Sequence, residues 1–294
     1  MKVLKVAVNE LNLKTNNGYS ISSLQFLPKI SNDKIIIISS ATGVLQKYYS
    51  KFASYFAAHG FIVYTFDYYG IGNSDSNPNR LKHNNCDLKS WGQNDQAAVV
   101  SFAKNYTSNA ELTLITHSIG GQIIGFNPNY QDIDKIVMVA SQSGYWKYFN
   151  GIHYFKMWLL WYVIIPLLTP FFGYFPSKKL RLFENLPKNM VYEWAKWGKR
   201  KDYLMHFYNA EEYFFDKIEV PILSLSFKGD NFAPIETVNW LTKQYINAKT
   251  ERVHFIKPIN SAMLKHFGFF KQKFKDPIWT MTMDWILTGK KPIE

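Results

Sequence analysis

A serine within residues 111–125, ELTLITHSIGGQIIG, has the sequence surroundings of a reactive nucleophile. Residues 111–116 alternate apolar and small polar side chains, a pattern that predicts a short buried strand. Ser118 comes directly after this strand, and Gly120 and Gly121 open an apolar segment that reads as the start of a helix. A serine at such a sharp turn stands clear of the backbone, while the N–H groups that follow can hold an oxyanion. The layout predicts a nucleophile elbow.

Thr116 departs from the usual elbow pattern G-x-S-x-G, since it occupies the place of the first glycine. Small residues are needed on both sides of the serine because strand and helix pass close together there. The departure puts the tightness of the turn in question, and a serine in an ordinary strand-to-helix loop is the alternative.

An acid and a base follow later in the chain, each after a predicted strand. Asp230 lies in a predicted loop after residues 220–227, and His266 lies in a predicted loop after residues 252–256. Imidazole can take the proton of a serine hydroxyl near neutral pH, and a carboxylate can fix its tautomer and stabilise the imidazolium. The order serine, acid, histidine is the one associated with an α/β-hydrolase arrangement. We therefore predict Ser118 as nucleophile, His266 as base and Asp230 as acid.

Other titratable residues compete for these roles. His254 lies within the last predicted strand, where a structural role is more common, and His117 adjoins the serine with its side chain directed elsewhere. Asp67 follows a strand and is interpreted as holding a glycine-rich loop, while Asp216 lies at the end of an insert. Asp230 is preferred as the acid.

Two backbone N–H groups are predicted to hold the oxyanion. Ile119 follows the serine directly, and Val44 follows Thr42 and Gly43 in the turn after the first buried strand. A plain strand-to-helix turn at Gly43 and Val44 is the alternative.

The surrounding elements predict one α/β domain. Asn16-Asn17-Gly18 separates two alternating segments, residues 4–8 and 19–27, which indicates an antiparallel hairpin at a sheet edge. Beyond it, predicted strands alternate with helices, a pattern typical of a mostly parallel central sheet with helices on both faces. The predicted strands are residues 34–39, 61–66, 111–116, 135–140, 220–227 and 252–256; the predicted helices are residues 48–59, 91–104, 234–245 and 277–287.

An aromatic insert interrupts this alternation. We assign residues 1–140 and 217–294 to the core domain and residues 141–216 to the insert, interpreted as a helical lid over a hydrophobic pocket. No residue between Lys156 and Lys178 is charged, so attachment to a membrane interface and a membrane span are alternatives. Pro166 and Pro170 are expected to break a continuous helix and so to disfavour a span.

Composition limits the partners and cofactors. The net charge of +12 draws a protein towards anionic surfaces, but the sequence has no nucleic-acid-reading motif, and a lysine-rich solvated surface explains it as well. Gly70 and Gly72 begin a dinucleotide fingerprint that Asp75 interrupts, and the seven histidines have no metal-ligand spacing. We expect no cofactor and no metal. Cys86 is the only cysteine, and residues 1–14 carry no signal-peptide core, so we expect a cytoplasmic location.

Six stretches in this order and spacing resemble a bacterial family of predicted serine-type α/β-hydrolases, over nearly the whole chain. They are residues 41–44, 66–74, 117–122, 141–146, 172–176 and 266–270. The resemblance implies the α/β-hydrolase fold and places the nucleophile at Ser118, the acid at Asp230 and the base at His266. It does not fix a substrate.

Three functional hypotheses follow from these residues. The first is a serine esterase or lipase-like enzyme acting on a small, hydrophobic acyl substrate. The second is an acyltransferase that forms the same acyl-enzyme but excludes water under an apolar lid, and the third is a non-catalytic ligand-binding protein on the same scaffold.

Overall fold

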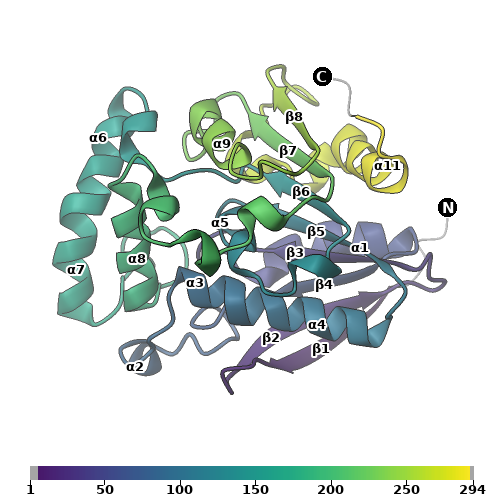
Figure 1. Cartoon of the computed structure of the whole chain (residues 1–294), viewed down its shortest axis with the longest axis horizontal. Helices are drawn as coiled ribbons and strands as arrows, with labels where there is room; N and C mark the ends of the chain where they lie inside the picture. The colour runs from purple at the N-terminus through teal and green to yellow at the C-terminus, as the bar shows by residue number, and fades with distance from the viewer. Residues whose placement is uncertain (1–5, 292–294) are drawn as a thin grey trace.

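A single eight-stranded sheet forms the centre of the molecule, which we describe from a computed structural model covering residues 6–291 (Figure 1). The strand order is β1-β2-β4-β3-β5-β6-β7-β8. Strand β2 pairs antiparallel with both β1 and β4, and all the other neighbouring strands pair parallel. The strands are β1 (Ala7–Lys14), β2 (Ser20–Leu27), β3 (Lys34–Ser39), β4 (Ile62–Phe66), β5 (Glu111–His117), β6 (Lys135–Val139), β7 (Ile222–Phe227) and β8 (Thr250–Phe255). The predicted mostly parallel sheet is confirmed.

The N-terminal hairpin occupies one edge of the sheet. Lys14 pairs with Ser20 across the turn, and Gly18 adopts a φ of 86°, which a glycine reaches without strain. The predicted hairpin is confirmed for its described part, although residues 4 and 5 of its first predicted segment lie outside the described residues.

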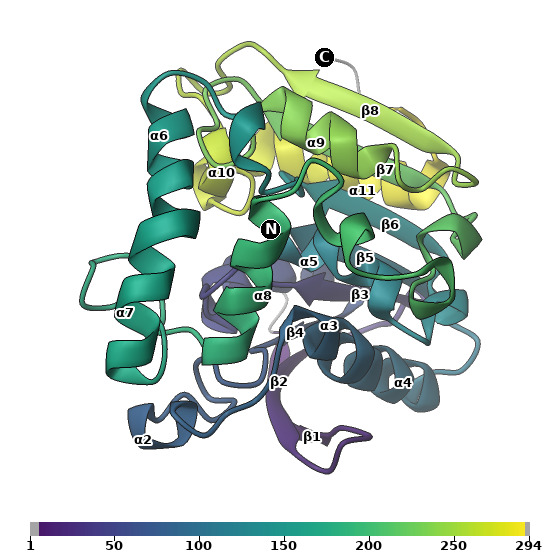
Figure 2. The ribbon, with the colours of Figure 1, turned by 60° about the vertical axis from the view of Figure 1, so that its left-hand side comes forward.

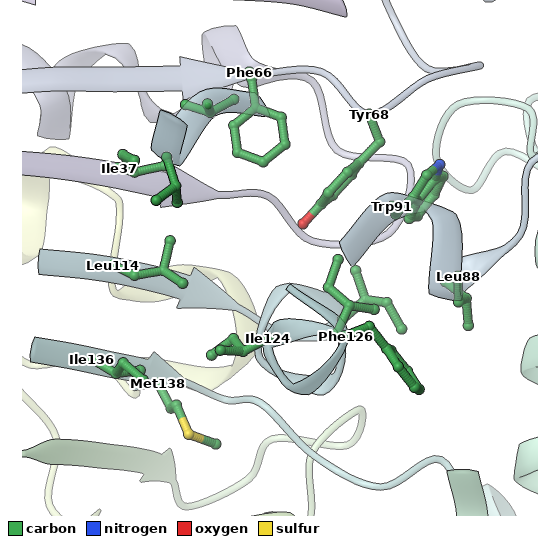
Figure 3. Close-up of a cluster of buried hydrophobic side chains, with 14 of the residues drawn as sticks. Ile37, Phe66, Tyr68, Leu88, Trp91, Leu114, Ile124, Phe126, Ile136 and Met138 are labelled. Carbon is green, nitrogen blue, oxygen red and sulfur yellow. The ribbon is translucent and has the colours of Figure 1, made fainter. Parts of the chain in front are cut away.

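Helices cover both faces of the sheet, which explains the continuous apolar run of β3. Ile35 and Ile37 face the core beneath α4, whereas Ile36 and Ile38 face the core beneath α1 and α11. Figure 3 shows part of the first core, where Tyr68 and Trp91 extend the packing beyond Phe66 at the end of β4. The helices are α1 (Ser50–Ala58), α2 (Pro78–Leu81), α3 (Leu88–Ser90), α4 (Ala97–Tyr106), α5 (Ile119–Gln122), α6 (Ile152–Leu159), α7 (Ile165–Phe172), α8 (Lys188–Gly198), α9 (Ile235–Thr242), α10 (Lys265–Gly268) and α11 (Thr280–Thr288).

The insert, residues 141–216, leaves the sheet after β6 and returns before β7. Its main helices α6, α7 and α8 form a group at one end of the sheet in both views (Figures 1 and 2). The indole N–H of Trp161 donates a hydrogen bond to the carbonyl of Gly144 at 3.0 Å, and this indole packs on Gly198, where an added Cβ would lie 2.4 Å from the indole nitrogen. The buried Trp161, which lies between α6 and α7, thus connects these helices to α8 and to the start of the insert.

One expectation about the insert is wrong. Pro166 and Pro170 do not break the helix, because α6, a π-helical turn (Leu160–Ile164) and α7 form one helix from Ile152 to Phe172. A proline inside an α-helix lacks a donor and its ring meets the carbonyl four residues earlier. Pro166 is the second residue of α7, just beyond the wider π turn, where these penalties are smallest, whereas Pro170 lies inside α7. The helix ends at Gly173, in a left-handed conformation with φ 77°.

A buried carboxylate connects the insert to the core. Glu193 of α8 accepts hydrogen bonds from the backbone N–H groups of Leu88 and Lys89, at 2.5 and 3.1 Å, and from the hydroxyl of Tyr208. Burial, followed by the nearby charge of Asp87, raises the pKa of Glu193 from 4.5 to about 7. Between about pH 4.5 and pH 7, the folded protein therefore keeps a proton on Glu193 that the unfolded chain releases.

This proton makes stability fall as the pH rises from about 4.5 to about 7, since the native state binds more protons than the unfolded state in that window. Glu193→Gln keeps the shape without the titration, so the loss of unfolding free energy between about pH 5 and pH 8 should shrink by about 1–3 kcal/mol. Urea unfolding at both pH values measures it. Glu211→Gln, at an exposed position of the insert, is the control and should leave the pH dependence unchanged. An unchanged slope for Glu193→Gln would contradict the assignment.

Candidate active site

Ser118 lies at a strained turn between β5 and α5. Its backbone has φ 54° and ψ −113°, a conformation that a non-glycine residue rarely adopts. The Ser118 N–H donates to the carbonyl of Val139 in the neighbouring strand at 3.0 Å, and this bond helps to hold the turn. The predicted sharp strand-to-helix turn is present.

Two glycines on the helix side explain how the turn accommodates Thr116. A Cβ at Gly120 would lie 2.6 Å from the carbonyl oxygen of Ser39, and one at Gly121 would lie 2.3 Å from Oγ of Ser141. Thr116 contacts the same Ser141 hydroxyl, with the two oxygens 3.1 Å apart. The missing glycine on the strand is therefore offset by a second glycine on the helix, and the turn remains tight.

His266 and Asp230, 36 residues apart in the chain, form a buried pair. Nδ1 of His266 lies 2.9 Å from Oδ2 of Asp230, and both side chains are almost completely buried. The other carboxylate oxygen accepts the N–H groups of Phe232 and Ala233, at 2.9 and 3.0 Å, which fixes its orientation. An imidazole that donates through Nδ1 keeps Nε2 as its proton acceptor. The segment expected as a loop around His266 is instead the short helix α10.

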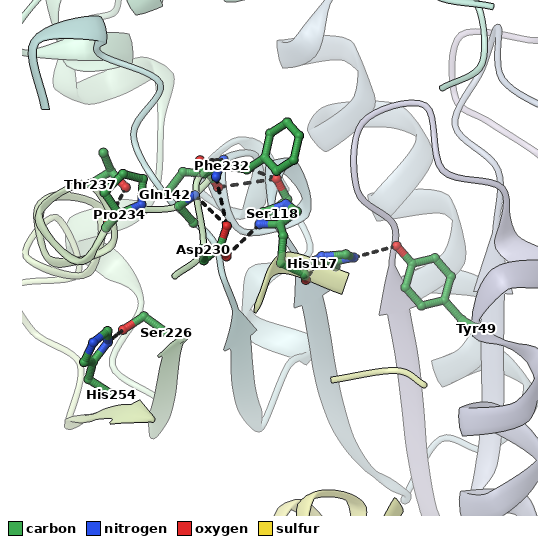
Figure 4. A network of polar contacts seen from close by, with 12 residues as sticks. Tyr49, His117, Ser118, Gln142, Ser226, Asp230, Phe232, Pro234, Thr237 and His254 are labelled. Atoms are coloured by element: carbon green, nitrogen blue, oxygen red, sulfur yellow. Dashed lines mark hydrogen bonds and ion pairs between the residues drawn. The ribbon is translucent and has the colours of Figure 1, made fainter. Parts of the chain in front are cut away.

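Ser118 and His266 line the same cavity, but the hydroxyl has another hydrogen-bond partner. Oγ of Ser118 lies 3.4 Å from Oε1 and 3.3 Å from Nε2 of Gln142, and this amide also donates to the carbonyl of Phe232 at 3.3 Å (Figure 4). The sequence analysis did not single out Gln142 as a site residue. Its position just after β6, beside the strand that carries Ser118, could have identified it, since ligands of parallel sheets bind at the carboxyl ends of the strands.

His117 belongs to a chain of hydrogen bonds behind the site. The N–H of Ala41 donates to the Tyr49 hydroxyl at 2.9 Å, and this hydroxyl lies 2.9 Å from Nδ1 of His117. Nε2 of His117 lies 3.0 Å from the backbone carbonyl of His266, which can only accept. Burial, followed by the charge of His266, lowers the pKa of His117 well below its ordinary value. His117 is therefore a neutral ring that donates from Nε2, and its side chain points away from Ser118 as expected.

The backbone donors near Ser118 differ in part from the prediction. Ile119 is the first residue of α5, directly after the serine. Val44, however, donates its N–H to the carbonyl of Ala41 at 3.1 Å, so this group closes a turn and the expectation that it is available to an oxyanion is wrong. Ala41 and Thr42 of the same turn line the cavity together with Ser118.

Two of the other competing residues, His254 and Asp67, have structural partners elsewhere. Nδ1 of His254 lies 2.6 Å from the Ser226 hydroxyl. Asp67 accepts the N–H groups of Gln46 and Asn73, at 2.7 and 3.0 Å, so it holds the glycine-rich loop as predicted. Burial raises the pKa of Asp67. Asp230 is thus the carboxylate that contacts the imidazole of His266.

The cavity above these residues is apolar and has a volume of about 130 Å³. The insert supplies much of its wall through Met157, Leu160, Ile165 and Trp194, and Phe232 and Phe267 of the core add aromatic rings. Within residues 6–291, no cluster of three or more His, Cys, Asp or Glu side chains could hold a metal ion. The arrangement can orient a carbonyl group in a largely apolar enclosure beside a serine hydroxyl.

The crowding at Gly121 predicts a defined cost for a methyl group. Gly121→Ala would place its Cβ 2.3 Å from Oγ and 2.5 Å from Cβ of Ser141, and overpacking of this kind costs about 1–3 kcal/mol of unfolding free energy. Ser141→Gly in the same chain removes both clashing atoms and should restore part of the loss beyond additivity. Urea unfolding of the four proteins measures this coupling, and strictly additive effects would contradict the described packing.

The Tyr49 hydroxyl is predicted to stabilise the folded state. Tyr49→Phe leaves the Ala41 N–H and Nδ1 of His117 without their partner inside the protein, so the unfolding free energy should fall by about 1–3 kcal/mol. Tyr106→Phe, at a side chain that is 51% exposed, is the control and should change it by less than about 0.5 kcal/mol. Equal stability of the two variants would contradict the described network.

Comparison with known proteins supplies a family. The family model described as serine aminopeptidase, S33 matches residues 31–184, or 154 of the 294 residues. The match includes the elbow at Ser118 and ends before Asp230 and His266. No curated protein matches the sequence.

Several solved structures have the same fold. A carboxyl esterase from Bacillus coagulans, solved with glycerol, aligns with a TM-score of 0.67 at 12% identity over 96% of this chain and 99% of its own. An esterase from Pyrococcus furiosus has a TM-score of 0.61 at 14% identity over 97% and 92% of the two chains. The esterase EaEST from Exiguobacterium antarcticum has a TM-score of 0.58 at 12% identity over 95% and 100%. Because the family model matches more than half of the sequence, the chain belongs to the serine aminopeptidase S33 family, a family of serine hydrolases with the α/β-hydrolase fold.

Proposed function

We propose that the protein is an esterase that hydrolyses a small, hydrophobic acyl ester through Ser118, His266 and Asp230. The observation that supports this most directly is the buried His266–Asp230 pair, since its imidazole lines the same apolar cavity as a serine held at a strained turn. The fold neighbours named as esterases agree with this reaction class.

In the proposed reaction, Oγ of Ser118 attacks the ester carbonyl while Nε2 of His266 takes the hydroxyl proton. The tetrahedral intermediate collapses, the leaving alcohol receives that proton, and an acyl-serine remains. Water then attacks the acyl-serine, again with His266 as base, and releases the carboxylic acid and free Ser118. The amide of Gln142, at 3.3 Å or more from Oγ, is a weak partner that the hydroxyl can exchange for the imidazole when substrate binds.

The oxyanion is proposed to be held by the backbone N–H groups of Ile119 and Thr42. Ile119 follows the nucleophile at the start of α5, and Thr42 lines the cavity beside Ser118, whereas the N–H of Val44 is already used in a turn. A donor of this kind stabilises the transition state by about 3–4 kcal/mol.

The insert is proposed to act as a lid that selects hydrophobic acyl groups. Its side chains supply most of the apolar wall above Ser118, so a charged substrate would lose its hydration without a partner there. A cytoplasmic location stays a prediction from the sequence.

An acyltransferase is the second candidate, favoured by the same apolar wall. If the insert excludes water after acylation, an alcohol or thiol can accept the acyl group in its place. A non-catalytic scaffold is the third candidate. Ligand binding alone, however, requires neither the strained backbone of Ser118 nor the buried His266–Asp230 pair.

Fluorophosphonate labelling and p-nitrophenyl esters of increasing chain length test the proposal. We expect stoichiometric labelling of the wild type, and Ser118→Ala should lose labelling and about 10⁴-fold or more in kcat/KM. Ser177→Ala is the matched control, because Ser177 lines the same cavity and should keep the activity within a few-fold. Wild-type hydrolysis by Ser118→Ala would refute the assignment. Partition of the acyl group to added alcohols or thiols, at the expense of hydrolysis, would favour the acyltransferase.

A further inference from the structure

The helix from Ile152 to Phe172 carries a row of exposed apolar side chains. We call six of them the outer face, with exposed fractions of 40–82%: Phe155, Trp158, Leu159, Tyr162, Leu167 and Phe171. Trp158 and Leu159 are adjacent, and the other neighbours in this row are three to five residues apart, which keeps the row on one side of the helix. Water is a poor environment for so many contiguous apolar groups, and surfaces of this kind mark interaction sites.

The opposite side of the same helix is already occupied. Trp161, Ile165 and Thr169 are buried, and Met157, Leu160 and Ile165 line the cavity above Ser118. The helix is therefore apolar around most of its circumference, yet one side is held by the protein core, partly through the Trp161–Gly144 hydrogen bond. The outer face is free to meet a second apolar phase.

The chain around this face is rich in cations, and one of them, Lys178, is paired with Glu184 at 2.6 Å. Residues 135–183 contain no Asp or Glu, although they include Lys147, Lys156, Lys178, Lys179 and Arg181. Two ammonium groups lie over aromatic rings at this face: Lys179 is 4.7 Å from the ring centre of Phe172, which adjoins the outer face, and Lys199 is 4.8 Å from that of Tyr162, which belongs to it. An apolar row bordered by lysines matches the acyl chains and the phosphates of an anionic bilayer.

We propose that the protein docks on anionic phospholipid membranes through the outer face, with the helix lying along the interface and the surrounding lysines among the lipid phosphates. The aromatic and aliphatic side chains would enter the boundary between headgroups and acyl chains, where Trp and Tyr are favoured. This goes beyond the proposed esterase reaction and does not depend on it.

Two other occupants fit less well. A second copy of the chain would bring the same lysines of both molecules together, and the pairing of Lys178 with Glu184 offsets this repulsion only in part. A membrane span is conceivable by length and composition, since the 21-residue helix has a mean hydropathy of 1.5 in its most apolar window. Crossing the bilayer would require the buried Trp161 to leave its hydrogen bond and would open the cavity wall, so the interfacial orientation keeps more of the fold.

Vesicle flotation tests the proposal with the full-length protein. The Ser118→Ala background is used so that no lipid is hydrolysed, which also separates this result from that of the esterase assay. We expect flotation with vesicles of phosphatidylcholine and phosphatidylglycerol, weak flotation with phosphatidylcholine alone, and release by high salt.

Two triple variants separate docking from general charge attraction. F155D/L167D/F171D places three charges on the outer face and should reduce the partition coefficient about tenfold or more. I30D/I246D/I256D changes the net charge equally at residues that are 79%, 71% and 52% exposed elsewhere, and should keep most of the binding. Circular dichroism and thermal unfolding establish that both variants are folded. K178Q/K179Q/R181Q, which leaves the apolar residues intact, should bind less tightly and show a weaker salt dependence.

Several results would overturn the proposal. They are the absence of flotation with anionic vesicles, equal binding by the two triple aspartate variants, resistance of the bound protein to alkaline carbonate extraction, which indicates a span, and a dimer in light scattering that F155D/L167D/F171D dissociates.

Discussion

The close approach of β5 and α5 around Ser118 is the constraint on which the rest of the site depends. The serine can stand clear of the sheet only because its backbone takes a φ of 54°, and the helix can follow at once only because Gly120 and Gly121 present no side chain to Ser39 and Ser141. Strain of this kind persists when the surrounding structure over-determines it. Here the parallel pairing of β5 with β3 and β6 fixes the strand, and the bond from Ser118 N–H to Val139 fixes the turn.

Pairing between strands that are far apart in the sequence then positions the acid and the base, which the local turn at Ser118 cannot do. Asp230 follows β7 and His266 lies in α10 beyond β8, so the parallel order β5-β6-β7-β8 carries both residues to the end of the sheet where β5 ends. Hydrogen bonds from the backbone N–H groups of Phe232 and Ala233 orient the Asp230 carboxylate for its contact with the His266 imidazole. The insert closes the same end with apolar side chains, and the buried Glu193 ties it to the core by hydrogen bonds to α3.

Much of this architecture could be predicted from sequence, and the exceptions have physical causes. Strand β3 matches its predicted bounds because a run of β-branched residues buried on both faces has few alternatives, and Asn16-Asn17-Gly18 specifies a hairpin locally. The pairing of Asp230 with His266 could be predicted from their order after strands. The use of the Val44 N–H could not, since a turn one residue tighter or wider decides which donor faces the cavity. Gln142 escaped notice because an amide carries no chemical signature in sequence. The expectation that Pro166 breaks the helix is wrong because a π turn accommodates this proline, and no residue pattern predicts a π turn.

The chain of hydrogen bonds through Tyr49 and His117 limits how this site can change. Every bond in it runs in one direction, from the Ala41 amide to the carbonyl of residue 266, so the His117 ring cannot turn around without breaking two of them. The terminal acceptor is a main-chain atom and survives any replacement of the side chain at position 266. A protein that loses the His266 imidazole therefore still holds the His117 ring in place through this backbone carbonyl. His117 cannot replace His266 as the base for Ser118.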